Sequence, residues 1–192
     1  MYPDVESFIE YLDSDYVPTA KMQYGTAVDA IIENPDKYWN ARTKEYIYDG
    51  IVFPEEYILR ITPFFDYNFP FQVNGKAEFK IGDTTVILSA RADQLHGLDT
   101  VEFKTVWNGY SYEKYDKSVQ WKCYNIIYDT VRVRYVVADS RVSSGGDITL
   151  KNVHQFYLYR ESKHYLEISE LLSQLLDLLK THNRIETMEK AV

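Results

Sequence analysis

The chain has 192 residues, 45% of them hydrophobic and 26% charged, which is typical of a globular protein with room for a single domain over residues 1–192. Its 21 basic residues are outnumbered by 29 acidic ones, and the net charge of −8 argues against a protein that coats nucleic acid by charge alone. The one cysteine, Cys123, excludes a disulfide, a four-cysteine zinc site or an iron–sulfur cluster formed within one chain.

The first half of the chain is predicted to fold as helices followed by strands. The apolar spacing in residues 21–33 indicates a helix with one buried face, and Pro35 should end it because the residue before a proline resists the α conformation. Further short helices are expected within 7–12 and 36–48. Apolar and β-branched runs predict strands at 56–61, 71–81, 84–93 and 101–106, with turns at Asn74-Gly75 and Gly82-Asp83.

The second half is predicted to contain two long helices and two strands. Helices are expected at 113–128 and 163–179, and strands at 131–138 and 149–160, the latter preceded by a loop at 143–147. This order predicts an α/β fold of the mixed α+β kind, in which helices flank a central mixed sheet.

Three ionisable residues occupy neighbouring strand positions. Asp93 ends one predicted strand, and Glu102 and Lys104 lie two residues apart on the next. Side chains two apart on a strand project from the same face, so Glu102 and Lys104 should point together while Phe103 enters the core. If the two strands are neighbours, Asp93 reaches the same place.

Carboxylates that meet at strand ends form an oxygen-rich site suited to Mg²⁺ or Mn²⁺. Phosphodiester hydrolysis uses such a site, because a bound divalent ion polarises the phosphate and acidifies bound water. A lysine beside the ion orients the attacking water and offsets charge in the transition state. The candidate catalytic residues are therefore Asp93, Glu102 and Lys104.

The tripeptide Glu-Phe-Lys occurs twice, first at residues 78–80 and again at 102–104. Because Glu-x-Lys is also a common exposed ion pair on strands, context must separate the two copies. The second copy follows a strand ending in Asp93 and precedes a helix that carries Gln120 and Tyr124. Residues four apart share one helical face, so this amide and this phenol are candidates to hold a phosphate or a base edge.

Together these residues resemble the PD-(D/E)xK nuclease superfamily, in its RecB-like and RecE-type phage-recombination exonuclease branch. Asp93, Glu102-Phe103-Lys104 and the pair Gln120 and Tyr124 match the family's Asp, Glu-x-Lys and Gln-x-x-x-Tyr motifs in order. Upstream, residues 25–35 (GTAVDAIIENP) are similar to the Gly-Thr-Ala-x-His helix of RecE-type exonucleases. The resemblance spans residues 20–128.

The resemblance implies a restriction-endonuclease-like core and a role for each matched residue. Asp93, Glu102 and the backbone carbonyl of Phe103 would bind Mg²⁺ or Mn²⁺, and Lys104 would assist the water. Gln120 and Tyr124 would position the DNA substrate and the site.

Asp29 is the departure from the family pattern, because the family has a metal-binding histidine at this position. Aspartate also coordinates Mg²⁺ and is a harder ligand than imidazole. The change is compatible with full activity, altered metal preference or reduced activity. Glu33, one helical turn further on, is another possible ligand or a structural partner.

The implied activity is that of a Mg²⁺-dependent exonuclease on linear duplex DNA in phage-type recombination or repair. The resemblance also implies a homo-oligomer and a single-strand annealing recombinase as partner. Two alternatives stay open: a structure-specific endonuclease or RNA nuclease, and a catalytically silent nuclease-fold binding module. Residues 1–10 show no secretory signal and no apolar run approaches membrane-spanning length, so we expect a cytoplasmic protein with no membrane partner.

Overall fold

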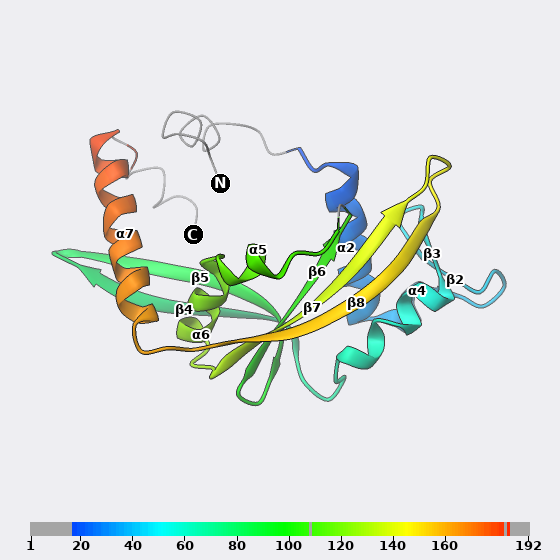
Figure 1. Ribbon diagram of the computed structural model, residues 1–192, viewed down its shortest axis with the longest axis horizontal. Helices are drawn as coiled ribbons and strands as arrows, with labels where there is room; N and C mark the ends of the chain where they lie inside the picture. Colours follow the sequence, from blue (N-terminus) through cyan, green and yellow to red (C-terminus); the bar gives the residue numbers. More distant parts are fainter. Residues whose placement is uncertain (1–16, 108, 183, 185–192) are drawn as a thin grey trace.

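The computed structural model describes residues 17–107, 109–182 and 184 (Figure 1). The helical turn expected at 7–12 lies outside the described residues. No helix in the described ranges is long and apolar enough to cross a membrane.

A five-stranded mixed sheet forms the centre of the molecule, with its strands in sequence order. All neighbours are antiparallel except the third and fourth strands, which run parallel. The strands are β4 (Phe71–Ile81), β5 (Thr84–His96), β6 (Asp99–Val106), β7 (Arg132–Val142) and β8 (Ile148–Tyr159). Because a parallel pair needs a crossover, the chain between β6 and β7 makes two helices, α5 (Tyr112–Asp116) and α6 (Gln120–Ile127).

Short elements precede the sheet and pack on one of its faces. They are α2 (Ala20–Glu33), α3 (Pro35–Tyr38), β1 (Trp39–Asn40), β2 (Glu45–Tyr48), β3 (Ile51–Pro54), α4 (Glu55–Leu59) and the 3₁₀ helix η1 (Thr62–Phe64). The short helix predicted within 36–48 is confirmed only at its start, where α3 ends at Tyr38, because the chain then forms β1 and β2 of a small antiparallel sheet. The predicted strand at 56–61 is also wrong: α4 occupies its first part and buries Tyr57 and Ile58.

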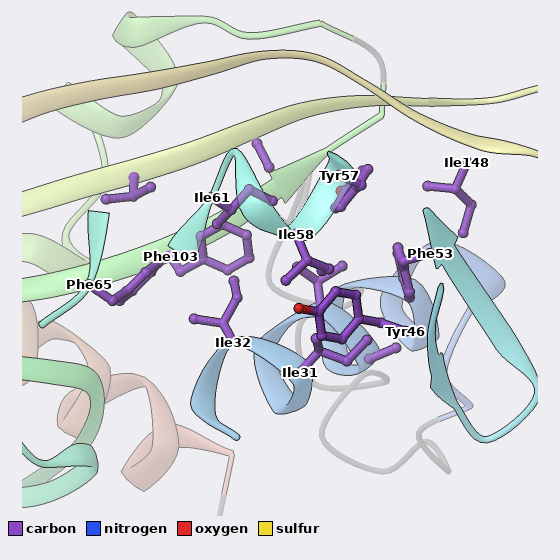
Figure 2. Close-up of a cluster of buried hydrophobic side chains, with 14 of the residues drawn as sticks. Ile31, Ile32, Tyr46, Phe53, Tyr57, Ile58, Ile61, Phe65, Phe103 and Ile148 are labelled. Carbon is purple, nitrogen blue, oxygen red and sulfur yellow. The ribbon is translucent and has the colours of Figure 1, made fainter. Parts of the chain in front are cut away.

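A separate apolar core packs against each face of the central sheet. On one face, Ile31 and Ile32 of α2 lie opposite Ile58 and Ile61, with Phe103 of β6 beside them (Figure 2). On the other face, α5 and α6 cover a second cluster of Tyr115, Trp121, Tyr124, Val133, Tyr135, Val137 and Leu158. The sheet is therefore enclosed from both sides where α2 and α6 approach it, and the candidate site residues lie between them.

The last helix, α7 (His164–Thr181), packs near the far end of the β4–β5 hairpin, at the opposite end of the molecule from α2 (Figure 1). Tyr165 stacks on Phe79 of β4 at a centroid distance of 4.9 Å, and Lys122 of α6 pairs with Glu167 at 2.5 Å. These contacts fix α7 to both the hairpin and α6.

Two local predictions need correction. The turn expected at Asn74-Gly75 does not exist, because β4 continues through both residues and Gly75 pairs with Ala90 of β5. The helix expected at 113–128 is broken between α5 and α6, where the indole of Trp121 donates to the carbonyl of Asp116 at 3.1 Å. The broader expectation of an α+β fold, with a mixed sheet flanked by helices, is confirmed.

Candidate active site

The site begins where β5 and β6 separate. These strands pair only over three positions, from Gln94 with Val101 to His96 with Asp99. Beyond that point β6 stays with β7 while β5 stays with β4, so the sheet forks (Figure 1). Asp93 and Glu102 are the first residues of each strand past the last pair, and this places both carboxylates at the fork.

Asp93 compensates for the lost strand pairing. Its Oδ2 accepts a hydrogen bond from the backbone N–H of Phe103 at 2.6 Å. A carboxylate thus caps an amide that would otherwise be unpaired where the strands separate. This contact joins the two sides of the fork and holds Asp93 next to the Glu102–Lys104 segment.

Glu102 is buried, with 2% of its surface exposed. Its Oε1 accepts hydrogen bonds from Lys104 Nζ and from Gln120 Nε2, the latter at 3.2 Å. Its Oε2 is buried and has no hydrogen-bond partner among the described residues. A buried carboxylate oxygen without a partner is costly, and a bound cation would satisfy it.

Helix α6 supplies the polar wall of the site. Gln120 Nε2 donates to the Tyr124 hydroxyl at 2.8 Å, as expected for residues on one helical face. Burial and the negative charge of Glu102 raise the pKa of Tyr124 well above its ordinary value, so this phenol stays protonated. Gln120 and Tyr124, the pair predicted from the sequence, therefore lie against Glu102.

The position of α6 is set by Tyr128, the residue that follows it. The Tyr128 hydroxyl accepts from the N–H of Ala92 at 3.0 Å and lies 2.7 and 2.8 Å from the carbonyls of Val73 and Ala90. Val73 belongs to β4, and Ala90 and Ala92 belong to β5, where they come just before Asp93. The end of α6 is thus hydrogen-bonded to both strands of the hairpin that carries the first carboxylate.

Asp29 approaches the fork from α2. It lines a small cavity together with Asp93 and Phe103. Burial, and secondly the charge of Asp93, raise the pKa of Asp29 to about 8. The position that the resemblance singles out therefore lies in the site, directly after buried Val28 of α2.

The charges at the fork influence one another. Burial and the charge of Asp93 raise the pKa of Glu102 to about 7, and burial raises the pKa of Asp93 although Lys104 opposes this. For Lys104, burial favours the neutral form, but Glu102, Asp93 and Asp29 outweigh it and raise the pKa of its ammonium. Three carboxylates sharing one ammonium make a site that favours an additional cation.

The side chains at the fork offer oxygen ligands of the kind that a divalent ion needs. Carboxylate oxygens are the ligands that Mg²⁺ prefers, and the unpartnered Oε2 of Glu102 is such a donor. Among the described residues, no group of three or more His, Cys, Asp or Glu side chains is arranged to hold a metal ion. Mg²⁺ commonly binds through one or two protein carboxylates and keeps several waters, so the residues at the fork fit it chemically.

Two residues of the site were missed from the sequence. Gln72 lies on β4 opposite Asp93, has a φ of 51°, lines the same small cavity and hydrogen-bonds the Asp93 carboxylate. A left-handed backbone at a non-glycine residue within a strand is unusual and is often found at functional sites. Nothing in the local sequence signals it, because glutamine has no preference for this conformation.

Arg91 is the second missed residue. It is exposed and lies two positions before Asp93 on β5, and its positive charge partly opposes the rise that burial causes in the pKa of Asp29 and of Asp93. Strand alternation places Arg91 and Asp93 on the same face, so the sequence contained a signal that would have found it.

One predicted candidate, Glu33, is not brought into this group, and the first Glu-Phe-Lys copy also lies outside it. Glu33 is exposed at the last residue of α2, and its charge acts on Lys37 rather than on the fork carboxylates. In the first Glu-Phe-Lys copy, Glu78 and Lys80 are both exposed while Phe79 is buried. The two copies of the tripeptide therefore have different environments.

Comparison with known proteins adds little on function. No protein-family model and no curated protein sequence matches the chain. A solved structure described as "Crystal structure of SSO0001" superposes with a TM-score of 0.46 and 14% sequence identity, over 59% of this chain and 52% of that chain. The match spans about half the length of that chain, and a likeness at this level carries no functional argument.

Proposed function

We propose that this protein is a metal-dependent nuclease that hydrolyses DNA phosphodiester bonds, acting as an exonuclease on linear duplex DNA. The observation that carries the proposal is the meeting of Asp93, Glu102 and Lys104 at the fork between β5 and β6. The contacts of Phe103 N–H with Asp93, and of Lys104 with Glu102, define that meeting.

The fork carboxylates would hold the ion. Asp93 and Glu102 are the principal candidates, with Asp29 and the carbonyl of Phe103 as further ligands. When bound, Mg²⁺ or Mn²⁺ supplies a Lewis acid for the phosphate and lowers the pKa of a coordinated water. Deprotonated Glu102 and Asp29 are needed for binding, so affinity should rise as pH passes through about 7 to 8.

Lys104 supplies positive charge rather than a base. Because the surrounding carboxylates raise its pKa, its ammonium is protonated at neutral pH. Held against Glu102, it can donate a hydrogen bond to the attacking water or to a phosphate oxygen in the transition state. The water must therefore lose its proton to another acceptor.

Gln120 and Tyr124 orient Glu102 and present donors to the substrate side of the site. The Gln120 amide bridges Glu102 and Tyr124, so it fixes the carboxylate rotamer. Exposed Arg91 lies on the same face as Asp93 and is placed to contact a phosphate of the DNA backbone.

The proposal is tested by incubating the full chain with linear and with closed circular duplex DNA, each in Mg²⁺ and in EDTA. An exonuclease degrades the linear DNA in Mg²⁺ and leaves the circle intact. Cleavage of the circle would instead indicate an endonuclease, and cleavage of RNA alone an RNA nuclease. The absence of metal-dependent cleavage of any of these substrates, in Mg²⁺ or in Mn²⁺, would contradict the proposal.

A further inference from the structure

One face of the β4–β5 hairpin is open to solvent along its length. Residues that pair across the two strands share a face. On the covered face, the position that a Cβ of Gly75 would occupy meets Tyr128, and Phe79 stacks on Tyr165 of α7. The side chains of the other face are all exposed: Asn74, Lys76, Glu78, Lys80, Thr85, Ile87, Ser89 and Arg91.

Four of these exposed residues form a patch at the end of the hairpin that leads to Asp93. Asn74 pairs with Arg91, and Lys76 pairs with Ser89. Opposite side chains have Cβ atoms about 5 Å apart, and the diagonal neighbours Lys76 and Arg91 are about 7–8 Å apart. We propose that this outer patch binds a backbone phosphate of the DNA strand next to the bond that is cleaved. The inference rests on the proposed nuclease function and deepens it, because it assigns a substrate subsite.

The side chains of the outer patch have the chemistry that a phosphate needs. All four can donate hydrogen bonds, and none is acidic. The planar guanidinium of Arg91 suits bidentate contact with a phosphate, whereas Lys76 supplies a compact positive charge. The amide of Asn74 and the hydroxyl of Ser89 are further donors of the kind that proteins use on phosphate oxygens.

The two cations of the outer patch are available to an anion. Neither Lys76 nor Arg91 forms an ion pair or a side-chain hydrogen bond with a described residue. Several basic side chains elsewhere are paired with acids: Lys117 with Glu113, Lys122 with Glu167, Arg132 with Asp99, Arg160 with Asp129 and Lys163 with Glu161. In a chain with a net charge of −8, two neighbouring cations without such partners make a local positive site.

Strand β5 connects the outer patch with the candidate active site. Arg91 lies two residues before Asp93, so both side chains project from one face, about 7 Å apart along the strand. The positive charge of Arg91 partly opposes the rise in the pKa of Asp93 and of Asp29, so its guanidinium is within electrostatic reach of both carboxyl groups. The Tyr124 hydroxyl also donates to the Arg91 carbonyl at 3.4 Å. A DNA strand with one phosphate at the fork can therefore place a neighbouring phosphate on the outer patch.

Lys80 lies on the same face of the hairpin but outside the outer patch. It pairs with Thr85 and lies four residues beyond Lys76, which is about 13 Å along the strand. Exposed Glu78 lies between the two lysines, and its negative charge disfavours a phosphate there. Lys80 is therefore a matched control, because it is an exposed lysine of the same strand and face that lies further from the fork.

The test measures DNA binding without chemistry. A short fluorescein-labelled duplex, with either a 5′-phosphate or a 5′-hydroxyl, is titrated in EDTA by fluorescence anisotropy. The variants of the outer patch are Lys76→Gln, Arg91→Gln and the two combined, and the control is Lys80→Gln. Each change replaces an exposed side chain, so each variant should fold, and its Tm verifies this.

Lys76→Gln should bind about threefold more weakly than the wild type, and the combined variant about tenfold more weakly. The slope of log Kd against log salt concentration should fall by about one and by about two, respectively. Lys80→Gln should bind within about twofold of the wild type and keep its salt slope. The losses should be equal for both duplexes, because a backbone phosphate is present in each.

Wild-type binding by the combined variant, an equal loss in Lys80→Gln, or a loss confined to the 5′-phosphorylated duplex would overturn the inference, as would a wild type that binds neither duplex. Failure of the proposed function is judged separately, by cleavage. If the wild type degrades linear DNA but the combined variant binds normally, the nuclease proposal stands without this subsite. If no DNA is cleaved yet the combined variant alone loses binding, the outer patch stands as a DNA-binding surface without the nuclease.

Discussion

At the scale of single residues, burial distinguishes two identical tripeptides. Glu102 is 2% exposed and contacts Lys104 and Gln120, whereas Glu78 and Lys80 are exposed on β4. Burial next to Asp93 raises the pKa of Glu102 to about 7. The chemistry proposed for the second copy therefore comes from its environment and not from its residue types.

The raised carboxyl pKa values predict how stability depends on pH in the metal-free protein. Asp29 at about 8 and Glu102 at about 7 bind protons more tightly in the folded than in the unfolded chain, where carboxyl pKa values are about 4. Their contribution to stability is full below that value and is lost as pH rises through 7 to 8. In EDTA, the Tm should fall by roughly 5 °C between pH 5 and pH 8.5.

Scanning calorimetry of the wild type and Asp29→Asn measures this dependence. The amide does not titrate, so the variant should show a smaller decrease in Tm over the same interval. A Tm that stays constant or rises from pH 5 to pH 8.5 in the wild type is the outcome that this explanation does not permit.

Lys104 is predicted to act in the chemical step more than in metal binding. Lys104→Met keeps Asp93 and Glu102, so Mn²⁺ should still bind by calorimetry, while the cleavage rate should fall by about 100-fold or more. Lys80→Met, in the exposed copy of the tripeptide, is the control and should cleave at the wild-type rate. Unchanged cleavage by Lys104→Met would remove the lysine from the mechanism.

At the scale of elements, the docking of α6 on the β4–β5 hairpin sets the geometry of the site. A Cβ on Gly75 would lie 2.6 Å from Cγ2 of Ile127 and closer still to the Tyr128 ring. Only glycine allows this approach, which is a usual reason for glycine inside a strand. The predicted turn at Asn74-Gly75 was wrong because glycine is typical both of tight turns and of strand positions that another element approaches closely.

Gly75→Ala is therefore expected to destabilise the protein by about 1–3 kcal/mol, since the added methyl group must displace α6. Gly25→Ala, at a helical position with nothing within 4 Å of the added Cβ, should instead stabilise it slightly. Urea denaturation of the two variants provides the measurement. Equal stability of Gly75→Ala and the wild type would show that α6 does not pack as described.

The elements that could be predicted are those with a clear period. The helix at 21–33, the strands of the central sheet and the final amphipathic helix all follow from apolar spacing. The strands β1 and β2 and the helix α4 were missed, because tyrosine and phenylalanine suit either structure when they pack against tertiary neighbours. The break before α6 depends on the Trp121 indole reaching Asp116, which no periodicity predicts.

At the scale of the whole molecule, the site requires three distant segments to meet. Strand spacing predicted that Glu102 and Lys104 project together and that Asp93 lies near them if β5 and β6 are neighbours. The position of Asp29 near these residues was expected only from the family resemblance. The contact between Gln72 and Asp93 was expected neither from strand spacing nor from the resemblance. Long-range packing, such as Ile31 of α2 against Ile58, decides where that helix lies and is not visible in local sequence (Figure 2).

The central claim is that the carboxylates at the β5–β6 fork serve a divalent ion in DNA cleavage. Mg²⁺-dependent degradation of linear DNA by the wild type, Glu102→Gln and Glu78→Gln, with folding of each verified by its Tm, tests it most directly. Glu102→Gln should fall to the background rate, and Glu78→Gln should stay within about twofold of the wild type. A folded Glu102→Gln variant that cleaves DNA as fast as the wild type would contradict the account.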